Sequence, residues 1–308
     1  MSHNFTETEI ENLNFEYSPS CHTKRYKSAE EAIQGHIAVI ESETFKVRNE
    51  SGFLIDLDVK YGDEDDEVLD VYYKESTAKD APLFVYVHGG YWQMLTKDTS
   101  AYCVAPLVNA GYHVLIVNYS LCPKVPLTQI ITQIKNCIKF ILKYASEHNS
   151  KSVSFAGHSA GAHLIISALS DASFWNSLDL NVRELLKQIY LISGVYDLTE
   201  LRYTTAVNNN NLLGLNDSNI KEVSPLYSNY SHLKSTNANG IQFNVYVGEY
   251  DSNTFQKQSQ DISIRLIRDI NESVSYCLLK NLDHFNIVED LRFPDYCMTK
   301  NIIHDIKF

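Results

Sequence analysis

One pentapeptide constrains the fold of this chain more than any other feature. Gly157-His158-Ser159-Ala160-Gly161 has the form Gly-x-Ser-x-Gly, and it lies between a strand-like run, Ser152 to Ala156, and a helix-like run, Ala162 to Leu169. A serine in such a strand-to-helix turn is held above the end of a sheet with its hydroxyl exposed, and the flanking glycines allow the crowded backbone. The pentapeptide predicts a nucleophile, Ser159, although the same spacing alone also occurs in ordinary helix-capping turns.

A second motif stands earlier in the chain. His88-Gly89-Gly90-Tyr91-Trp92-Gln93 follows directly after the strand-like run Leu83 to Val87. Glycines in a loop at the end of an early strand let backbone N–H groups approach a substrate oxygen, as in an oxyanion hole. The start of a helix also presents free N–H groups to an anion. We therefore expect an oxyanion hole made by the amides of Gly89, Gly90 and Ala160.

An acid and a base follow Ser159 in chain order. Asp251 comes after the apolar run Phe243 to Val247, and His284 comes after the run Tyr276 to Leu279. Nucleophile, acid and base in this order, each after a strand, are typical of the α/β-hydrolase fold. The sequence thus predicts a catalytic triad of Ser159, Asp251 and His284.

Each member of this triad has competitors. Asp197 also follows a strand-like run, Ile189 to Ile192. We prefer Asp251 because it follows the next strand, the penultimate one before His284. His88, His158 and His163 compete with His284 for the role of base. His158 adjoins the nucleophile and is expected to point away from it, and His163 is expected on a buried helix.

Strand-like and helix-like runs alternate along the chain. Such alternation predicts a mainly parallel sheet with helices on both faces, in a single α/β-hydrolase domain over residues 1–308. Ligands of such sheets bind outside the carboxyl ends of the strands, where all four motifs fall. Besides the runs already named, we expect strands at 53–59, 68–73 and 113–118, and helices at 28–40, 102–109, 128–148, 255–270 and about 299–306.

The segment 201–239 interrupts this alternation. It is rich in Asn and Ser, with four consecutive asparagines at 208–211, which favours a surface insertion. Apolar anchors such as Leu213 and Leu215 favour instead a partly helical cap over the active site, and we predict the cap.

Composition limits the classes of partner. The net charge of −12 disfavours nucleic acid and anionic lipid as partners, and no apolar run reaches the roughly 20 residues that span a bilayer. The six widely spaced cysteines form no Cys-x-x-Cys pair and mostly stand in apolar runs, so we expect buried free thiols, no metal site and a reducing compartment. The polar, acidic stretch Met1 to Asn14 lacks the pattern of a signal peptide. We expect a cytosolic protein.

At these motifs the chain resembles the kynurenine formamidase (arylformamidase) family. The hexapeptide His88 to Gln93 is close to the oxyanion loop of that family, and residues 157–164 match its nucleophile turn. Residues 193–198, Asp251-Ser252 and 283–289 are also similar, as are 17–20 and 61–63. Cys122-Pro123-Lys124 departs slightly, since the family commonly has Ala-Pro-Lys there.

The resemblance implies hydrolysis of N-formyl-L-kynurenine to kynurenine and formate, without a cofactor. Tyr91 and Trp92, beside the oxyanion loop, are candidates to pack on the kynurenine ring, although an aromatic pair at such a place is as often simple packing. Two other classes stay open: a broad carboxylesterase with the same triad, and a hydrolase-fold binding protein without catalysis. A homodimer is also possible.

Overall fold

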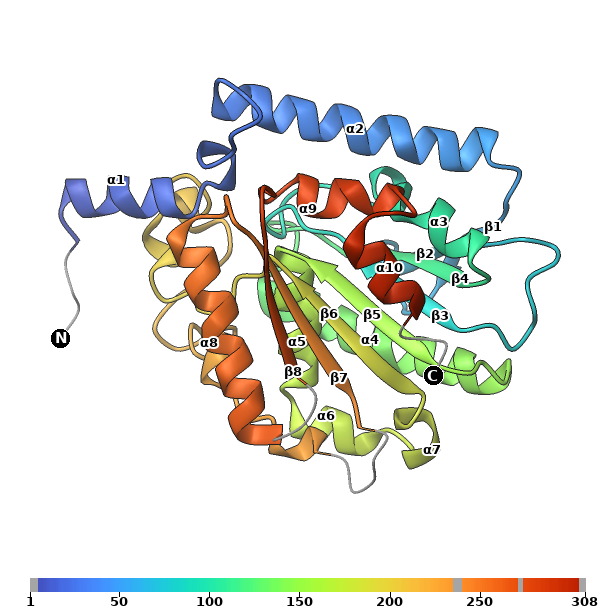
Figure 1. Ribbon diagram of the computed structural model, residues 1–308. Helices are drawn as coiled ribbons and strands as arrows, with labels where there is room; N and C mark the ends of the chain where they lie inside the picture. Colours follow the sequence, from blue (N-terminus) through green and yellow to red (C-terminus); the bar gives the residue numbers. More distant parts are fainter. Residues whose placement is uncertain (1–4, 235–239, 271–273, 305–308) are drawn as a thin grey trace.

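The fold is built on one twisted sheet. The structure, a computed structural model, describes residues 5–234, 240–270 and 274–304. Within them eight strands pair in the order β1-β2-β4-β3-β5-β6-β7-β8, in which β1 and β2 are antiparallel to their neighbours and β4, β3 and β5 to β8 are parallel (Figure 1). The strands are β1 (Leu54–Lys60), β2 (Val68–Tyr73), β3 (Leu83–Val87), β4 (His113–Val117), β5 (Val153–His158), β6 (Leu186–Ile192), β7 (Gln242–Gly248) and β8 (Val274–Leu279).

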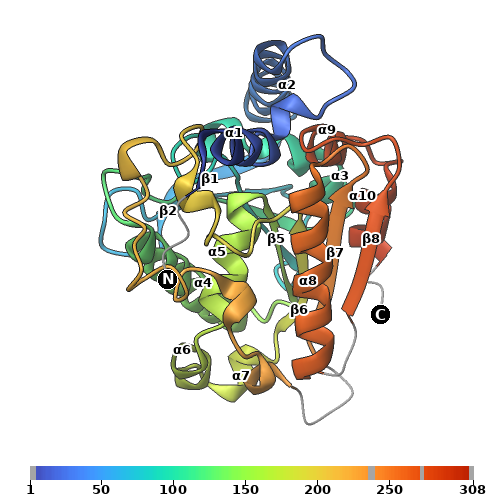
Figure 2. The same ribbon diagram turned by 90° about the vertical axis from the view of Figure 1, so that its left-hand side faces the viewer.

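Helices cover both faces of the sheet because alternate strand residues point to opposite sides. In β3, Leu83, Val85 and Val87 pack with α4, α5 and α8, whereas Phe84 and Tyr86 pack with α2, α3 and α10 (Figures 1 and 2). The α-helices are α1 (Glu7–Glu16), α2 (Ala29–Glu50), α3 (Val104–Asn109), α4 (Leu127–Glu147), α5 (Ala160–Leu169), α6 (Ala172–Ser177), α7 (Leu180–Arg183), α8 (Asn253–Ile270), α9 (Asn286–Glu289) and α10 (Cys297–His304).

The predicted α/β-hydrolase fold is confirmed, and the predicted strands lie where the structure has strands. β2 and β3 have the predicted bounds, and α4 is shifted by one residue from the predicted range 128–148. The strand before Ser159 continues to His158, two residues further than predicted. The predicted helix 299–306 is observed as α10, although residues 305 and 306 lie outside the described part of the chain.

The N-terminal helices differ most from expectation. The predicted helix 28–40 continues to Glu50, because Thr44 and Val47 extend the buried stripe of His36 and Ile40 at helical spacing. Helix α1 was not predicted at all. Its signal is a capping box, in which Thr6 and Glu9 each bond to the backbone of the other.

The Asn-rich segment is described as far as residue 234; residues 235–239 lie outside the described residues. It contains short 3-10 turns at Leu201–Tyr203, Asn209–Asn211, Pro225–Tyr227 and Ser231–Leu233, and Leu213 and Leu215 are buried. Its role as a cap stays a prediction.

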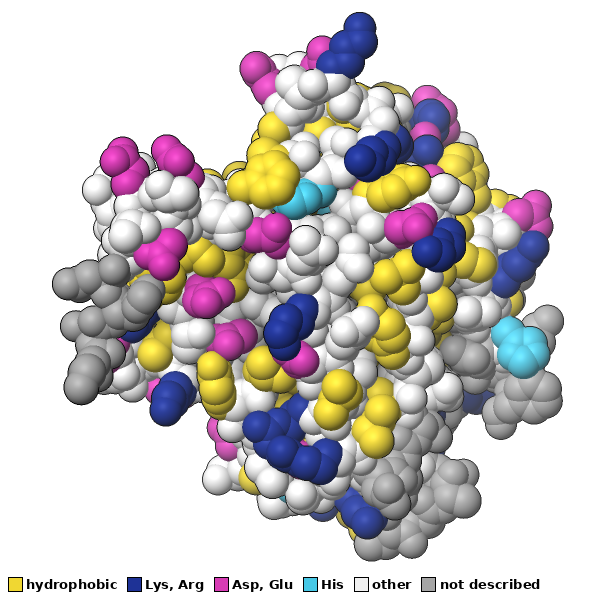
Figure 3. Space-filling view, turned by 60° about the vertical axis from the view of Figure 1, so that its left-hand side comes forward, with side chains coloured by type: hydrophobic (Ala, Val, Ile, Leu, Met, Phe, Trp, Pro, Cys, Tyr) yellow, Lys and Arg dark blue, Asp and Glu magenta, His cyan; other side chains and the backbone are white. Residues whose placement is uncertain are grey.

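On the face shown in Figure 3, acidic, basic and apolar side chains are interspersed. The negative net charge therefore does not form one continuous acidic patch on this face. In the described ranges no helix is long and apolar enough to cross a bilayer. All six cysteines are free, but the prediction that they are buried holds only in part, since Cys21 and Cys297 are exposed.

Candidate active site

Ser159 occupies a strained turn between β5 and α5. Its φ of 52° and ψ of −114° are rare for a residue with a side chain, and its own N–H donates to Ile192 O at 2.8 Å. Such strain persists only where the surroundings enforce it, and it is the conformation that a nucleophile turn requires. Gly161 allows the close packing, because a Cβ there would lie 2.1 Å from Val87 O.

Asp251 and His284 meet at the same edge of the sheet. His284 Nδ1 lies 2.7 Å from Asp251 Oδ1, and both side chains are buried. A carboxylate only accepts hydrogen bonds, so Nδ1 carries the proton and the lone pair of the neutral imidazole lies on Nε2. This is the tautomer that a general base acting on Ser159 needs.

Ser193, which sequence reasoning missed, holds the acid in place. Its Oγ donates to Asp251 Oδ2 at 2.6 Å, and the Gly248 N–H donates to the same oxygen at 3.1 Å. Ser193 follows β6 directly, with a φ of 45°. The available signals were its position after the strand that neighbours β7 and the family resemblance of residues 193–198.

The competing groups are engaged elsewhere. Asp197 accepts from the backbone N–H and the hydroxyl of Thr199 and from Tyr227 Oη. Burial lowers the pKa of His88 and of His163 to about 4, so both rings are neutral at neutral pH. His163 lies within α5, as predicted, and bonds to Val223 O at 2.8 Å.

His158 requires a correction. It was expected to point away from the nucleophile, but it lines the same cavity as Ser159, and its Nε2 lies 2.8 Å from His284 O. The pKa of His158 is well below its ordinary value, mainly because the ring is buried and secondly because His284 lies nearby. A neutral ring that donates to a carbonyl can support the His284 loop but has no free base at that nitrogen.

The oxyanion loop lies against Ser159. A Cβ on Gly89 would lie 3.2 Å from the Ser159 Cβ and 3.0 Å from His158 Nδ1, so only glycine fits easily there. Gly90 has a φ of 95°. Tyr119 Oη donates to His88 O and Gly89 O, at 2.8 and 3.1 Å, which fixes these carbonyls. Ala160 begins α5, where the first N–H groups are not used within the helix.

The two aromatic residues of this loop lie in different surroundings. Tyr91 lines the cavity and donates its hydroxyl to Tyr17 O at 2.6 Å. Trp92 is fully buried, with its ring 4.8 Å from that of His163. The prediction of a substrate contact is therefore corrected for Trp92, for which the alternative of simple packing holds: its ring packs against His163 of α5 and does not line the cavity.

The cavity of about 230 Å³ in front of Ser159 and His284 has a mostly apolar lining. Part of this lining was not foreseen, since it comes from the N-terminal segment and α2. Ala206 and Val207 of the Asn-rich segment also contribute. Besides the oxyanion loop, the nucleophile turn and His284, the lining residues are Tyr17, Ser18, Pro19, Ser20, Ile33, His36, Ile37, Met94, Leu95, Ala206, Val207 and Phe285.

An ion cluster links the N-terminal segment that lines the cavity to the loop that carries His284. Arg25 donates to Asp283 and to Glu289, with distances of 2.8 and 2.9 Å for the shortest contacts. Thr23 Oγ1 adds a hydrogen bond to Asp283 at 2.5 Å. These hydrogen bonds hold the pKa of Asp283 at about 2 although burial opposes ionisation. The N-terminal side of the cavity is therefore held next to His284, the proposed base.

Comparison with known proteins places this geometry in a family. The chain is 36% identical to a kynurenine formamidase of Drosophila melanogaster over 92% of this chain and 93% of that protein. It is 34% identical to a kynurenine formamidase of Danio rerio over 94% of each. The chain belongs to the kynurenine formamidase family. A family model named BD-FAE, of the α/β-hydrolase superfamily, also matches residues 69–266.

Solved structures of other proteins have the same fold as this chain. Esterase B of Lactobacillus rhamnosis superposes with a TM-score of 0.62 over 90% of this chain and 91% of that chain, at 15% identity. Such a likeness concerns the fold alone. In the described residues no group of three or more His, Cys, Asp or Glu is arranged to hold a metal ion.

Proposed function

We propose that this chain hydrolyses the formyl amide of N-formyl-L-kynurenine to L-kynurenine and formate. The observation that carries the proposal is the Asp251–His284 hydrogen bond at the edge of the cavity that Ser159 lines, in a chain similar to kynurenine formamidases over more than nine tenths of its length.

The proposed reaction uses groups of this chain alone. His284 Nε2 takes the hydroxyl proton as Ser159 Oγ attacks the formyl carbon, and Asp251 stabilises the imidazolium that forms. The amides of Gly89, Gly90 and Ala160 stabilise the oxyanion. The proton on His284 then passes to the aniline nitrogen as it leaves. Water, deprotonated by His284, then attacks the formyl-serine, and His284 returns this proton to Ser159 Oγ as formate leaves.

The loop near Ser159 favours a small acyl group. Gly89 approaches the Ser159 side chain closely, and Tyr91 and Met94 line the cavity beside Gly90. A formyl group carries only hydrogen on its carbonyl carbon. Each further carbon would push the carbonyl away from the oxyanion amides, and a misplacement of about 1 Å can cost roughly 10²-fold in rate.

The test compares formyl, acetyl and butyryl derivatives of one aromatic amine by kcat/KM. We expect the formyl anilide to react at least about 10²-fold faster than the acetyl one. A rate that rises from formyl to butyryl would favour the alternative, a carboxylesterase of the same fold. The Ser159→Ala variant, purified and assayed in the same way, measures the background rate of any contaminating esterase, which is then subtracted.

The remaining expectations accompany this proposal. We propose a cytosolic location, which the six free thiols support because thiols persist in reducing compartments. Reaction without a cofactor, Tyr91 as a substrate contact, a cap over residues 201–239 and a homodimer stay predictions. Sedimentation of the purified chain would test the last.

A further inference from the structure

The proposed substrate has an ammonium and a carboxylate that the apolar cavity must accommodate. Several polar groups of the lining already have hydrogen-bond partners within the chain. Tyr91 donates to Tyr17 O, Tyr17 Oη accepts from Gln258, and His158 Nε2 bonds to His284 O. His36 differs from these groups in having a polar atom to spare.

His36 projects from α2 and is 6% exposed. Its Nδ1 lies 2.8 Å from Glu289 Oε1, and its ring packs on Phe285 with centroids 4.8 Å apart. A carboxylate only accepts, so Nδ1 carries the proton. Within the described part of the chain Nε2 has no hydrogen-bond partner, and the ring lines the cavity with Ser159 and His284.

The residues behind His36 hold it firmly. Glu289 is buried, and its carboxylate also receives two hydrogen bonds from Arg25, at 2.9 and 3.3 Å. Arg25 is fixed in turn by Asp283, next to the base. A ring fixed by such a network is preorganised to bind a ligand without further loss of side-chain entropy.

We propose that His36 Nε2 binds the charged α-amino-acid end of the substrate and so sets specificity for an amino-acid formanilide over a simple one. The inference rests on the proposed function and names the substrate contact that the sequence alone does not reveal. A neutral ring accepts from the ammonium and a charged ring donates to the carboxylate, so both forms recognise this end.

The test uses two variants that separate the two ring nitrogens. His36→Asn keeps a donor near the position of Nδ1, so the bond to Glu289 is retained while the reach to the substrate is lost. His36→Gln extends an amide toward the position of Nε2 and should restore part of the selectivity. His148→Gln, at the end of α4 and not part of the lining, is the matched control.

The substrates are N-formyl-L-kynurenine and 2-formamidoacetophenone, which keeps the ring, ketone and formamide but lacks the amino-acid end. We expect His36→Asn to lower kcat/KM for N-formyl-L-kynurenine roughly 10- to 100-fold, mainly through KM, since a hydrogen bond to a charged group is lost. The rate on 2-formamidoacetophenone should change less than about twofold. Analogues that lack only the amine or only the carboxylate then identify the group bound.

The outcomes are distinct. An equal loss on both substrates would make His36 a structural residue and overturn the proposal, as would no loss on either. A wild-type enzyme that cleaves acetyl anilides faster than formyl ones, or no formanilide at all, would instead refute the proposed function on which it rests. Thermal unfolding of both variants shows whether a loss reflects folding.

Discussion

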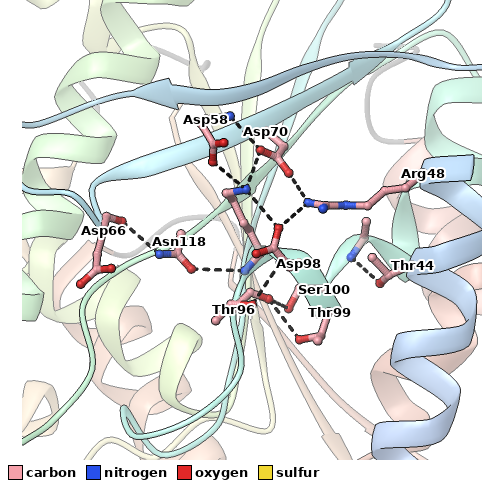
Figure 4. Close-up of polar contacts among 12 residues, drawn as sticks. Thr44, Arg48, Asp58, Asp66, Asp70, Thr96, Asp98, Thr99, Ser100 and Asn118 are labelled. Atoms are coloured by element: carbon pink, nitrogen blue, oxygen red, sulfur yellow. Dashed lines mark hydrogen bonds and ion pairs between the residues drawn. The ribbon is translucent and has the colours of Figure 1, made fainter.

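Two ion clusters lie near the two ends of α2. They differ in whether a polar atom is left without a hydrogen-bond partner. The cavity cluster consists of Arg25, His36, Asp283 and Glu289. The distal cluster consists of Arg48, Asp58, Asp70, Lys97 and Asp98 (Figure 4). Both join α2 or its flank to a different part of the fold, but only the cavity cluster ends in a ring nitrogen that faces a ligand site.

The distal cluster is saturated. Asp70 is fully buried, and its two oxygens receive Lys97 Nζ, the Asp58 N–H and Arg48. Lys97 Nζ also contacts Asp58 and Asp98, at 2.9 and 3.1 Å. Burial alone would lower the pKa of Lys97, but its hydrogen bonds with Asp58 and Asp70 raise it instead.

The contrast separates a structural role from a functional one. A buried charge whose partners are complete contributes to order and stability but offers nothing to a ligand. Lys97 stands beyond the oxyanion loop, and the distal cluster ties the turn Lys97–Thr99 to β2 through Asp70. The cavity cluster keeps one atom free and lies beside His284, which is where a contact with substrate is useful.

The largest effect should come from the nucleophile next to the cavity cluster. Ser159→Ala is expected to lower kcat by about 10⁴- to 10⁶-fold with the fold intact, because only the oxyanion hole and binding remain. Lys97→Met, in the distal cluster, should leave kcat of the folded protein within a few fold. Steady-state kinetics measures both. A loss of less than tenfold in folded Ser159→Ala would move the nucleophile elsewhere.

The next largest effect distinguishes the two aspartates. Asp251→Asn should lower kcat by about 10⁴-fold, because an amide at this position favours the wrong tautomer of His284. Asp197→Asn should lower kcat less than tenfold, since its carboxylate bonds to Thr199 and Tyr227. If the two effects on kcat were reversed, Asp251 would not be the acid.

The distal cluster should dominate stability. Lys97→Met is expected to lower the free energy of unfolding by about 3–5 kcal/mol, because it removes one partner of a buried carboxylate. The raised pKa of Lys97 means that its contribution is present below about pH 10.5 and is lost as the pH rises through the folded-state value. In urea unfolding the difference from wild type should stay constant from pH 7 to about 10 and begin to shrink only above about pH 10.5. Lys143→Met, in an exposed pair with Glu147, should cost less than about 1 kcal/mol.

Of the two ion clusters, the cavity cluster should contribute less to stability, because Arg25 is 30% exposed. Arg25→Gln should lower the free energy of unfolding by about 1–3 kcal/mol. The pKa of Asp283 is lowered to about 2 in the folded protein, so the stabilisation is present above about pH 4 and is lost as the pH falls toward 2. The difference between wild type and variant in urea unfolding should therefore shrink only below pH 4. A difference that shrinks already between pH 7 and 5 would mean that another group carries it.

Much of the fold followed from local pattern. The strand runs before His88 and Ser159, and the amphipathic α4, were predicted within one or two residues because burial on a sheet face or a helix stripe leaves a short-range signature. The order of Ser159, Asp251 and His284 is likewise a property of the chain. The structure brings Asp251 and His284 into hydrogen-bond contact, as parallel strands end at one edge.

The tertiary structure decided which side chains surround the cavity. Ser193 lies 58 positions before the carboxylate that it orients, and His36 lies 253 positions before Glu289. No local pattern encodes such contacts, because they depend on how separate elements pack. The same packing took Trp92 into the core while its neighbour Tyr91 lines the cavity. The sequence by itself determined the sheet and the chemistry at its edge. The walls of the cavity were determined only by packing between distant segments, because burial is a property of the whole fold.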